Sequence, residues 1–184
     1  MSTIWAAVLV NYTAIISEVV GRGGSVVTSE VNAELGARAR DNLADYANVK
    51  VEITEIEATP FDPGECDAMF INAGMTHPLP IWLDRLRQGG RIVLPITMTT
   101  PSGGGFGAMV KIVRSGETFS AGVVSAVGIF SAIGLRDASL EESIKAAIKS
   151  QKLMRLKSVR RDTHELTDTC ILHAPRACLS SADA

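Results

Sequence analysis

The feature that most constrains the fold is a regular alternation of strand-like and helical segments along the first hundred residues. Continuous β-branched runs such as residues 25–31, SVVTSEV, are typical of strands that are covered on both faces. The segments between the runs carry apolar residues at helical spacing, and the first of them ends in glycines, GRGG. This order predicts a mostly parallel sheet with helices on both faces. We expect strands at residues 3–10, 25–31, 49–56, 66–74 and 91–98, and helices at residues 11–20, 32–46 and 79–90.

The chain changes character after residue 100. Residues 107–124 read as two strands around the turn SGE, which predicts an antiparallel hairpin. Ser139, with Glu142 three residues later, is a capping box that predicts the start of a helix. Residues 169–174, TCILHA, have the pattern of a last short strand. The fold class we expect is α/β: a Rossmann-like sheet, mostly parallel, with an antiparallel C-terminal hairpin and helices on both faces.

The composition allows a substantial core and argues against several classes of partner. The 184 residues are 46% hydrophobic and 21% charged, which suits a folded domain at residues 1–150 and a C-terminal extension at residues 151–184 that packs on it or trails from it. The net charge of −2 gives no electrostatic case for nucleic acid or a membrane surface. The start of the chain does not read as a signal peptide, and the three cysteines read as reduced thiols, so we expect a cytoplasmic protein. The apolar stretch 119–135 is interrupted by three glycines and favours a buried strand and a packed loop over a membrane helix.

Candidate binding residues follow the predicted strands, because ligands of open parallel sheets bind at the carboxyl ends of the strands. Glu30 ends the second strand, where a carboxylate can accept hydrogen bonds from both hydroxyls of a ribose or can favour the N-terminus of the next helix. Glu55 and Glu57 follow the third strand and could accept from an adenine amino group or be solvated. After the fourth strand, residues 72–78, NAGMTHP, combine polar groups with small residues that leave room for a ligand.

The stretches 23–51 and 66–97 resemble the class I S-adenosylmethionine-dependent methyltransferases, and most closely the protein-L-isoaspartate O-methyltransferase family. The segment NYTAIISEVVG is similar to the helix that follows the family's glycine-rich loop, and residues 159–180 are similar to the C-terminal segment of bacterial relatives. The resemblance covers most of the chain from about residue 11 onward, and it is carried by the order and spacing of the segments rather than by one motif. It implies the family's sheet, with one antiparallel strand near its edge.

The resemblance also implies roles for individual residues. Glu30 would bind the ribose hydroxyls of S-adenosylmethionine, and Glu55 would lie near the adenine. The remaining expected cofactor-binding residues are Tyr12, Thr13, Val31, Asn72, Ala73 and Gly74. At the mouth of the site, the candidate catalytic residues are Asn72, Thr76 and His77. His77 could orient the substrate or stabilise its own turn.

The sequence departs from the family before residue 11. Val8 and Val10 stand where the family has glycines, and a branched Cβ resists the positive φ of such a loop. The chain also begins too late to contain the family's N-terminal segment, so we expect an N-terminally truncated member.

Two functions follow from these features. The first is transfer of a methyl group to a carboxylate, such as an L-isoaspartyl residue in a damaged protein, or to a small molecule. This reaction needs alignment and exclusion of water rather than a strong base. The second is a catalytically silent remnant that acts, if at all, as a non-enzymatic binding or interaction domain.

A metal site is not expected. His164, Cys170, His173 and Cys178 have no common zinc spacing, and Cys170 and His173 would face opposite sides of one strand.

Overall fold

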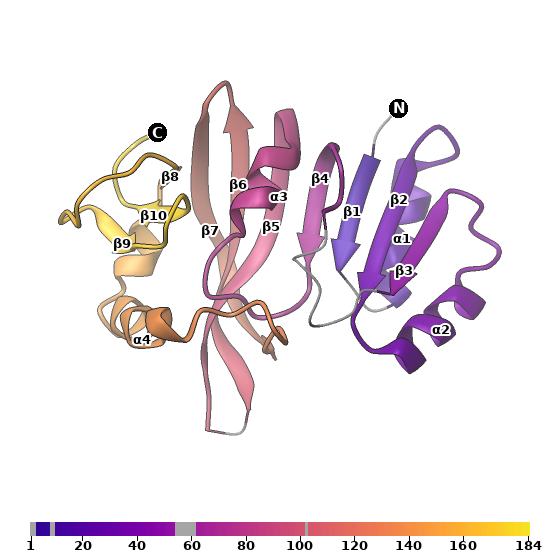
Figure 1. The fold of residues 1–184 in the computed structure, drawn as a ribbon, viewed down its shortest axis with the longest axis horizontal. Helices are drawn as coiled ribbons and strands as arrows, with labels where there is room; N and C mark the ends of the chain where they lie inside the picture. The colour runs from indigo at the N-terminus through magenta and orange to yellow at the C-terminus, as the bar shows by residue number, and fades with distance from the viewer. Residues whose placement is uncertain (1–2, 8–9, 54–61, 102) are drawn as a thin grey trace.

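Ten strands form one sheet in the computed structural model, which describes residues 3–7, 10–53, 62–101 and 103–184. The strand order is β3-β2-β1-β4-β5-β6-β7-β8-β10-β9 (Figure 1). The first five strands are β1 (Thr3–Ala7), β2 (Ser25–Glu30), β3 (Val49–Ile53), β4 (Cys66–Ile71) and β5 (Leu86–Thr99). The last five are β6 (Gly104–Ser115), β7 (Thr118–Phe130), β8 (Ser158–Arg160), β9 (Cys170–Leu172) and β10 (Cys178–Ser180).

The sheet is parallel in its N-terminal half and antiparallel in the rest. β1 pairs in parallel with β2 and β4, and the same holds for β2 with β3 and β4 with β5. β5, β6 and β7 form a long antiparallel unit, to which the three short strands β8, β10 and β9 are added. The predicted fold class is therefore confirmed, and the antiparallel part extends beyond the predicted hairpin.

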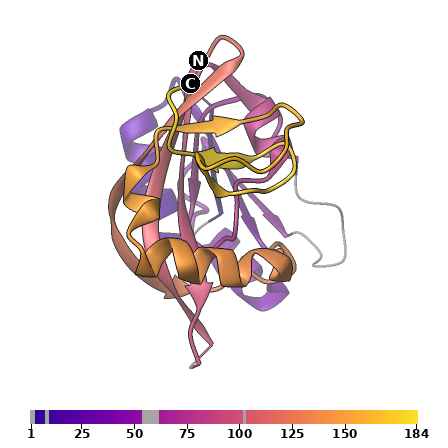
Figure 2. The same cartoon turned by 90° about the vertical axis from the view of Figure 1, so that its left-hand side faces the viewer.

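The helices flank this sheet on both faces. They are α1 (Val10–Val20), α2 (Ala33–Asn42), α3 (Pro80–Arg85) and α4 (Glu141–Lys149), with short 3-10 turns at Ala138–Leu140 and Lys152–Arg155. In Figure 1, α1 lies behind β1 and β2, whereas α3 lies in front of the sheet, and Figure 2 shows these two helices on opposite sides. No helix among the described residues is long and apolar enough to cross a membrane.

The core lies on the face of the sheet that carries α3 and α4. Along β5, Ile92, Leu94 and Ile96 are fully buried, and Pro95 and Thr97 on the other face are buried as well, so this part of the strand is covered on both faces. Trp82 of α3 and Ile144 of α4 belong to the same buried cluster. Along β7 the side chains are mostly half-buried or exposed, which differs from the buried strand that the apolar stretch 119–135 predicts.

Three predicted helix boundaries are wrong. The helix predicted to reach Gly90 ends at Arg85, because Leu86 already pairs with Cys66 of β4 and opens β5. Ser139 does not cap the fourth helix; the side chain of Asp137 instead accepts the Ser139 N–H and caps the 3-10 turn that precedes α4. The predicted start of the second helix is confirmed, since the side chain of Asn32 accepts a hydrogen bond from Leu35 N at 2.9 Å. Its predicted end at residue 46 is wrong, because α2 ends at Asn42.

Candidate functional site

The carboxyl ends of the parallel strands meet at one edge of the sheet, where the sequence predicts a ligand. Glu30 ends β2 and pairs in register with Ile53, the last residue of β3. Asn72 follows Ile71, the last residue of β4. β1 lies between β2 and β4, so Glu30 and Asn72 are two strand spacings apart, about 10 Å across the strands. The sheet therefore brings both predicted residues to the same edge.

Glu30 fulfils one of the two roles that its position suggests, the one at the N-terminus of the next helix. The residue is half-buried, and its Oε1 accepts a hydrogen bond from the backbone N–H of Asn32 at 2.9 Å. Because Asn32 caps α2, the Glu30 carboxylate lies at the positive end of that helix. A carboxylate has about four lone-pair sites, so this one bond leaves acceptor capacity for a ligand. Val31 is half-buried beside it, whereas Glu55, Glu57 and Val8 lie outside the described residues.

The two candidates on α1 differ in their accessibility. Tyr12 is 47% exposed, and its ring centroid lies 5.5 Å from that of Phe70 on β4. Thr13 is fully buried, and its hydroxyl donates to Thr28 Oγ1 of β2 at 3.4 Å. Tyr12 is thus open to a ligand, while Thr13 holds α1 against the sheet.

The small residues after β4 serve the packing of the sheet. Asn72 and Ala73 are half-buried, but Gly74 is buried and joins the end of β7. Its N–H donates to Phe130 O at 2.8 Å, and its carbonyl accepts from Ala132 N at 2.9 Å. The space left by Gly74 is filled by protein atoms, since a Cβ there would collide with Thr97 Oγ1.

Thr76 and His77 form a hydrogen-bonded pair. Thr76 is fully buried; its Oγ1 accepts from the backbone N–H of Asp137 at 3.0 Å and lies 2.9 Å from His77 Nδ1. The Thr76 hydroxyl keeps its own proton free, and it donates this proton to His77 Nδ1 in the tautomer that carries the ring proton on Nε2. Burial lowers the pKa of His77, and the nearby Asp137 carboxylate opposes that effect in part. His77 is consequently neutral at pH 7.

Arg136 connects this turn to the rest of the structure, and the sequence gives no sign of it. Its guanidinium donates to Gly74 O at 2.7 Å, to Thr97 O at 2.8 Å and to Thr97 Oγ1 at 3.1 Å. It also pairs with Glu141 Oε2 of α4 at 2.8 Å. Burial alone would raise the pKa of Glu141, but the bonds from Thr99 N and Arg136 hold it below its ordinary value. Because Gly74 lies 62 residues away in sequence, no local pattern could reveal this contact.

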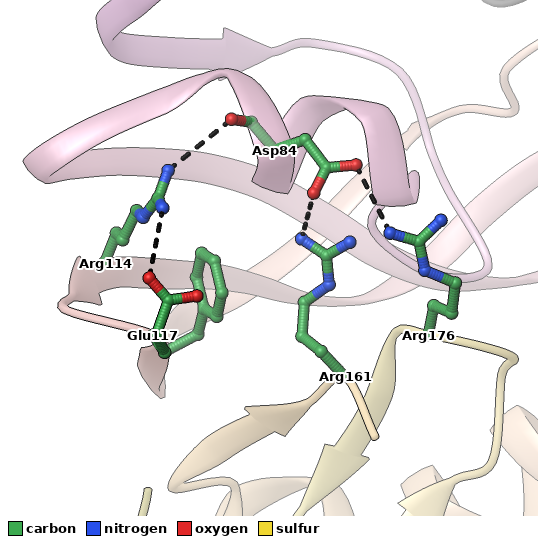
Figure 3. A pocket seen from close by; sticks show the side chains of 6 residues that line it. Asp84, Arg114, Glu117, Arg161 and Arg176 are labelled. Atoms are coloured by element: carbon green, nitrogen blue, oxygen red, sulfur yellow. Dashed lines mark hydrogen bonds and ion pairs between the residues drawn. The ribbon is translucent and has the colours of Figure 1, made fainter. Parts of the chain in front are cut away.

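A hollow lies at the opposite edge of the sheet, beside the turn between β6 and β7. It encloses about 230 Å³ and is lined by Asp84, Arg114, Glu117, Phe119, Arg161 and Arg176. Figure 3 shows that Arg161 and Arg176 both point toward the carboxylate of Asp84, at 2.7 and 3.6 Å. Arg114 donates to Leu86 O at 2.7 Å. These ion pairs join the C-terminal segment to α3, and Arg114 joins β6 to the start of β5.

The four residues at which the sequence predicts no metal site lie close together in the structure. One side-chain ligand atom from each of His164, Cys170, His173 and Cys178 lies within 4.8 Å of the others. The expectation that Cys170 and His173 face opposite sides of one strand is wrong, because β9 ends at Leu172 and His173 is outside it.

Comparison with known proteins supports the family resemblance. Residues 11–120 match the family model of protein-L-isoaspartate(D-aspartate) O-methyltransferase. No curated protein sequence matches the chain. A solved structure described as a protein-L-isoaspartate O-methyltransferase is similar with a TM-score of 0.63 and 20% identity, over 91% of this chain and 50% of that one. A second, described as a protein-L-isoaspartate O-methyltransferase (beta-aspartate methyltransferase) from Plasmodium falciparum in complex with S-adenosyl-L-homocysteine, has a TM-score of 0.54 and 16% identity, over 72% and 66% of the two chains. At these identities the structures show a shared fold, and this chain spans about half the length of the first.

Proposed function

Because this chain belongs to the protein-L-isoaspartate(D-aspartate) O-methyltransferase family, we propose that it binds S-adenosylmethionine at the carboxyl edge of its parallel strands. The observation that carries the proposal is the position of Glu30 at the end of β2, with acceptor capacity left on its carboxylate. The related structure from Plasmodium falciparum, which is in complex with S-adenosyl-L-homocysteine, supports the same cofactor class.

The proposed roles follow the geometry of this edge. Glu30 would accept the ribose hydroxyls, and the exposed ring of Tyr12 together with Val31 would flank the nucleoside. Asn72 and Ala73, half-buried after β4, would line the methionine side. We assign Thr13, Thr76 and Gly74 no direct contact, because their polar groups already bond within the protein.

We further propose that the acceptor is a carboxylate, such as that of an L-isoaspartyl residue in a damaged protein. When bound, S-adenosylmethionine supplies a methyl group on a positively charged sulfur. A carboxylate is already anionic at pH 7, so this chain needs no general base. His77 is neutral, and in the tautomer with its proton on Nε2 it would donate to the acceptor carboxylate and hold it in place.

Calorimetric titration with S-adenosylhomocysteine tests the cofactor site. Glu30→Gln keeps an oxygen that can accept the Asn32 N–H but removes the charge, so we expect binding to weaken about tenfold or more. Glu34→Gln is the matched control, because Glu34 lies in the first turn of the neighbouring helix α2 and is exposed. Equal binding by Glu30→Gln and wild type would contradict the role of Glu30.

A non-enzymatic binding domain is the second candidate, and the packing of Thr13, Gly74 and Thr76 favours it. Three of the residues expected at the site serve the fold instead, and Val8 and Val10 replace the family's glycines. A folded chain that binds no S-adenosylhomocysteine would support this candidate. Methylation of an isoaspartyl peptide with labelled S-adenosylmethionine, lost in Glu30→Gln, would support the enzyme.

A further inference from the structure

The C-terminal strands bring two histidines and two cysteines to one point. Cys170 begins β9 and Cys178 begins β10, and these strands are antiparallel neighbours in the sheet. His164 lies in the loop before β9, and His173 follows directly after that strand. We propose that His164, Cys170, His173 and Cys178 together bind one zinc ion.

The distances suit a tetrahedral site. Zinc–sulfur bonds of about 2.3 Å and zinc–nitrogen bonds of about 2.0 Å place the ligand atoms of a tetrahedron ~3.3–3.8 Å apart. Cys170 Sγ and His164 Nε2 lie 3.5 Å apart. The other pairs of ligand atoms fall within 4.8 Å, so movements of about 1 Å close the site.

The surroundings of His164 orient it as a ligand. Its Nδ1 lies 3.0 Å from the carbonyl oxygen of Asp162, to which it can donate its ring proton. The lone pair of Nε2 then points toward Cys170 Sγ. Metal-binding histidines in proteins are usually held by such a bond from the second ring nitrogen to a carbonyl or carboxylate.

The surroundings of the other ligands fit a metal as well. The Thr167 backbone N–H and hydroxyl lie 3.5 and 3.3 Å from Cys170 Sγ, and such donors stabilise a thiolate. Nδ1 of His173 is buried with no hydrogen-bond partner among the described residues. A buried polar atom without a partner is destabilising, and a shift of the imidazole would let one of its ring nitrogens bind the ion.

The ligand set selects both the metal and its role. Thiolate and imidazole groups favour zinc over calcium or magnesium, which prefer oxygen ligands. Four protein ligands fill a tetrahedral site and leave no position for a substrate, which is typical of structural zinc. The ion would hold the loop before β9, which contains His164, and the segment after β9, which begins at His173, close to β9 and β10. The ion pairs of Arg161 and Arg176 with Asp84 also hold the C-terminal segment against α3 (Figure 3).

Metal analysis of the reduced, full-length chain tests this proposal. After purification with zinc and gel filtration, we expect about one zinc per chain, and we expect Cys170→Ser and Cys178→Ser to lose it. The chain itself supplies controls, because its one remaining cysteine and one remaining histidine lie outside the cluster. Cys66→Ser and His77→Gln should therefore keep the zinc.

Cobalt(II) provides a readout that does not depend on yield or on methyl transfer. Cobalt added to the metal-free, reduced chain should give a sulfur-to-metal charge-transfer band and the intense visible bands of a tetrahedral site. If Cys170→Ser or Cys178→Ser does not fold, His164→Gln and His173→Gln should each change this spectrum. A folded, reduced wild-type chain that takes up neither metal would overturn the proposal, and so would a cobalt spectrum unchanged in all four variants.

Discussion

At the residue scale, Gly74 shows how a sequence pattern can be detected and its purpose misread. The small residues after β4 predict room for a ligand, but the room at Gly74 is taken by Thr97 Oγ1 and by Phe130 O. The sequence could not reveal this, because Phe130 lies on β7, far along the chain. The position of Glu30 was easier to predict, since it depends only on where β2 ends.

Gly74→Ala should therefore destabilise the fold. The added Cβ must displace Thr97 and the chain around it, which we expect to cost about 1–3 kcal/mol. Urea unfolding followed by circular dichroism measures this loss. Gly23→Ala is the control, because a Cβ at Gly23 meets no atom within 4 Å, and its free energy of unfolding should not fall. An unchanged midpoint for Gly74→Ala would contradict the observed packing.

His77 predicts a dependence of stability on pH. Burial lowers its pKa below the ordinary 6.5, so the unfolded chain binds a proton more readily than the folded chain does. The contribution is fully present above pH 6.5 and decreases as the pH falls below that value toward the lowered pKa of the folded state. The free energy of unfolding, measured by urea between about pH 7.5 and 5, should decrease less steeply in His77→Asn than in wild type. Identical slopes in the two proteins would rule out this contribution.

At the scale of elements, the sequence predicts the position of helix α1 correctly, but the side of the helix that packs on the sheet is not its most apolar side. Its apolar side predicts burial of Ile15 and Val19, yet these residues are 59% and 80% exposed. The helix buries Thr13 and Ser17 instead, at 0% and 3% exposure. Ser17 Oγ donates to Asn48 Oδ1 at 2.6 Å, a contact across 31 residues that no helical periodicity contains.

Truncating the exposed side of α1 should have little effect. Ile15→Ala removes a side chain that is mostly in solvent, so we expect a change within about 0.5 kcal/mol in the free energy of unfolding. The same substitution at Ile144 of α4, which is fully buried, should cost about 2–5 kcal/mol. Chemical denaturation of both variants measures the difference. A large loss from Ile15→Ala would mean that this side of α1 is covered in solution.

The zinc cluster illustrates a limit at the same scale. Cys170 and His173 are three residues apart, so a continuous strand would separate them onto opposite faces. The strand ends after Leu172, and the following turn returns His173 toward Cys170. Strand ends are the least certain part of a sequence-based prediction, and here one residue decides whether four ligands meet.

At the scale of the whole molecule, the parallel and antiparallel halves share strand β5, and Arg136 adds side-chain contacts at their boundary. The alternation of segments in the sequence predicts the parallel half well, because each strand and helix is specified locally. The joining contacts are not local: Arg136 bonds to the turn after β4, to the end of β5 and to α4. Its ion pair with Glu141 is largely buried, with side-chain exposures of 13% and 20%.

Arg136→Met should be among the most damaging single substitutions. It leaves Glu141 without its partner and removes the donors to Gly74 O and Thr97 O, and breaking a buried ion pair on one side costs about 3–5 kcal/mol. Adding Glu141→Gln should recover part of that loss, because an amide still accepts the Thr99 N–H without carrying a charge. Urea unfolding of both single variants and the double variant measures the coupling.

An exposed ion pair on α4 serves as the comparison for the largely buried pair of Arg136 and Glu141. Glu142 and Lys145 lie 2.7 Å apart, but the Glu142 side chain is 84% exposed. Lys145→Met should therefore change the free energy of unfolding by less than about 1 kcal/mol. If Arg136→Met were as mild, or if the effects of Arg136→Met and Glu141→Gln simply added, the backbone pairing of β5 and apolar packing would hold this boundary without the ion pair. A strong, non-additive loss would instead mean that a charge more than sixty residues from Gly74 holds the turn after β4 in place.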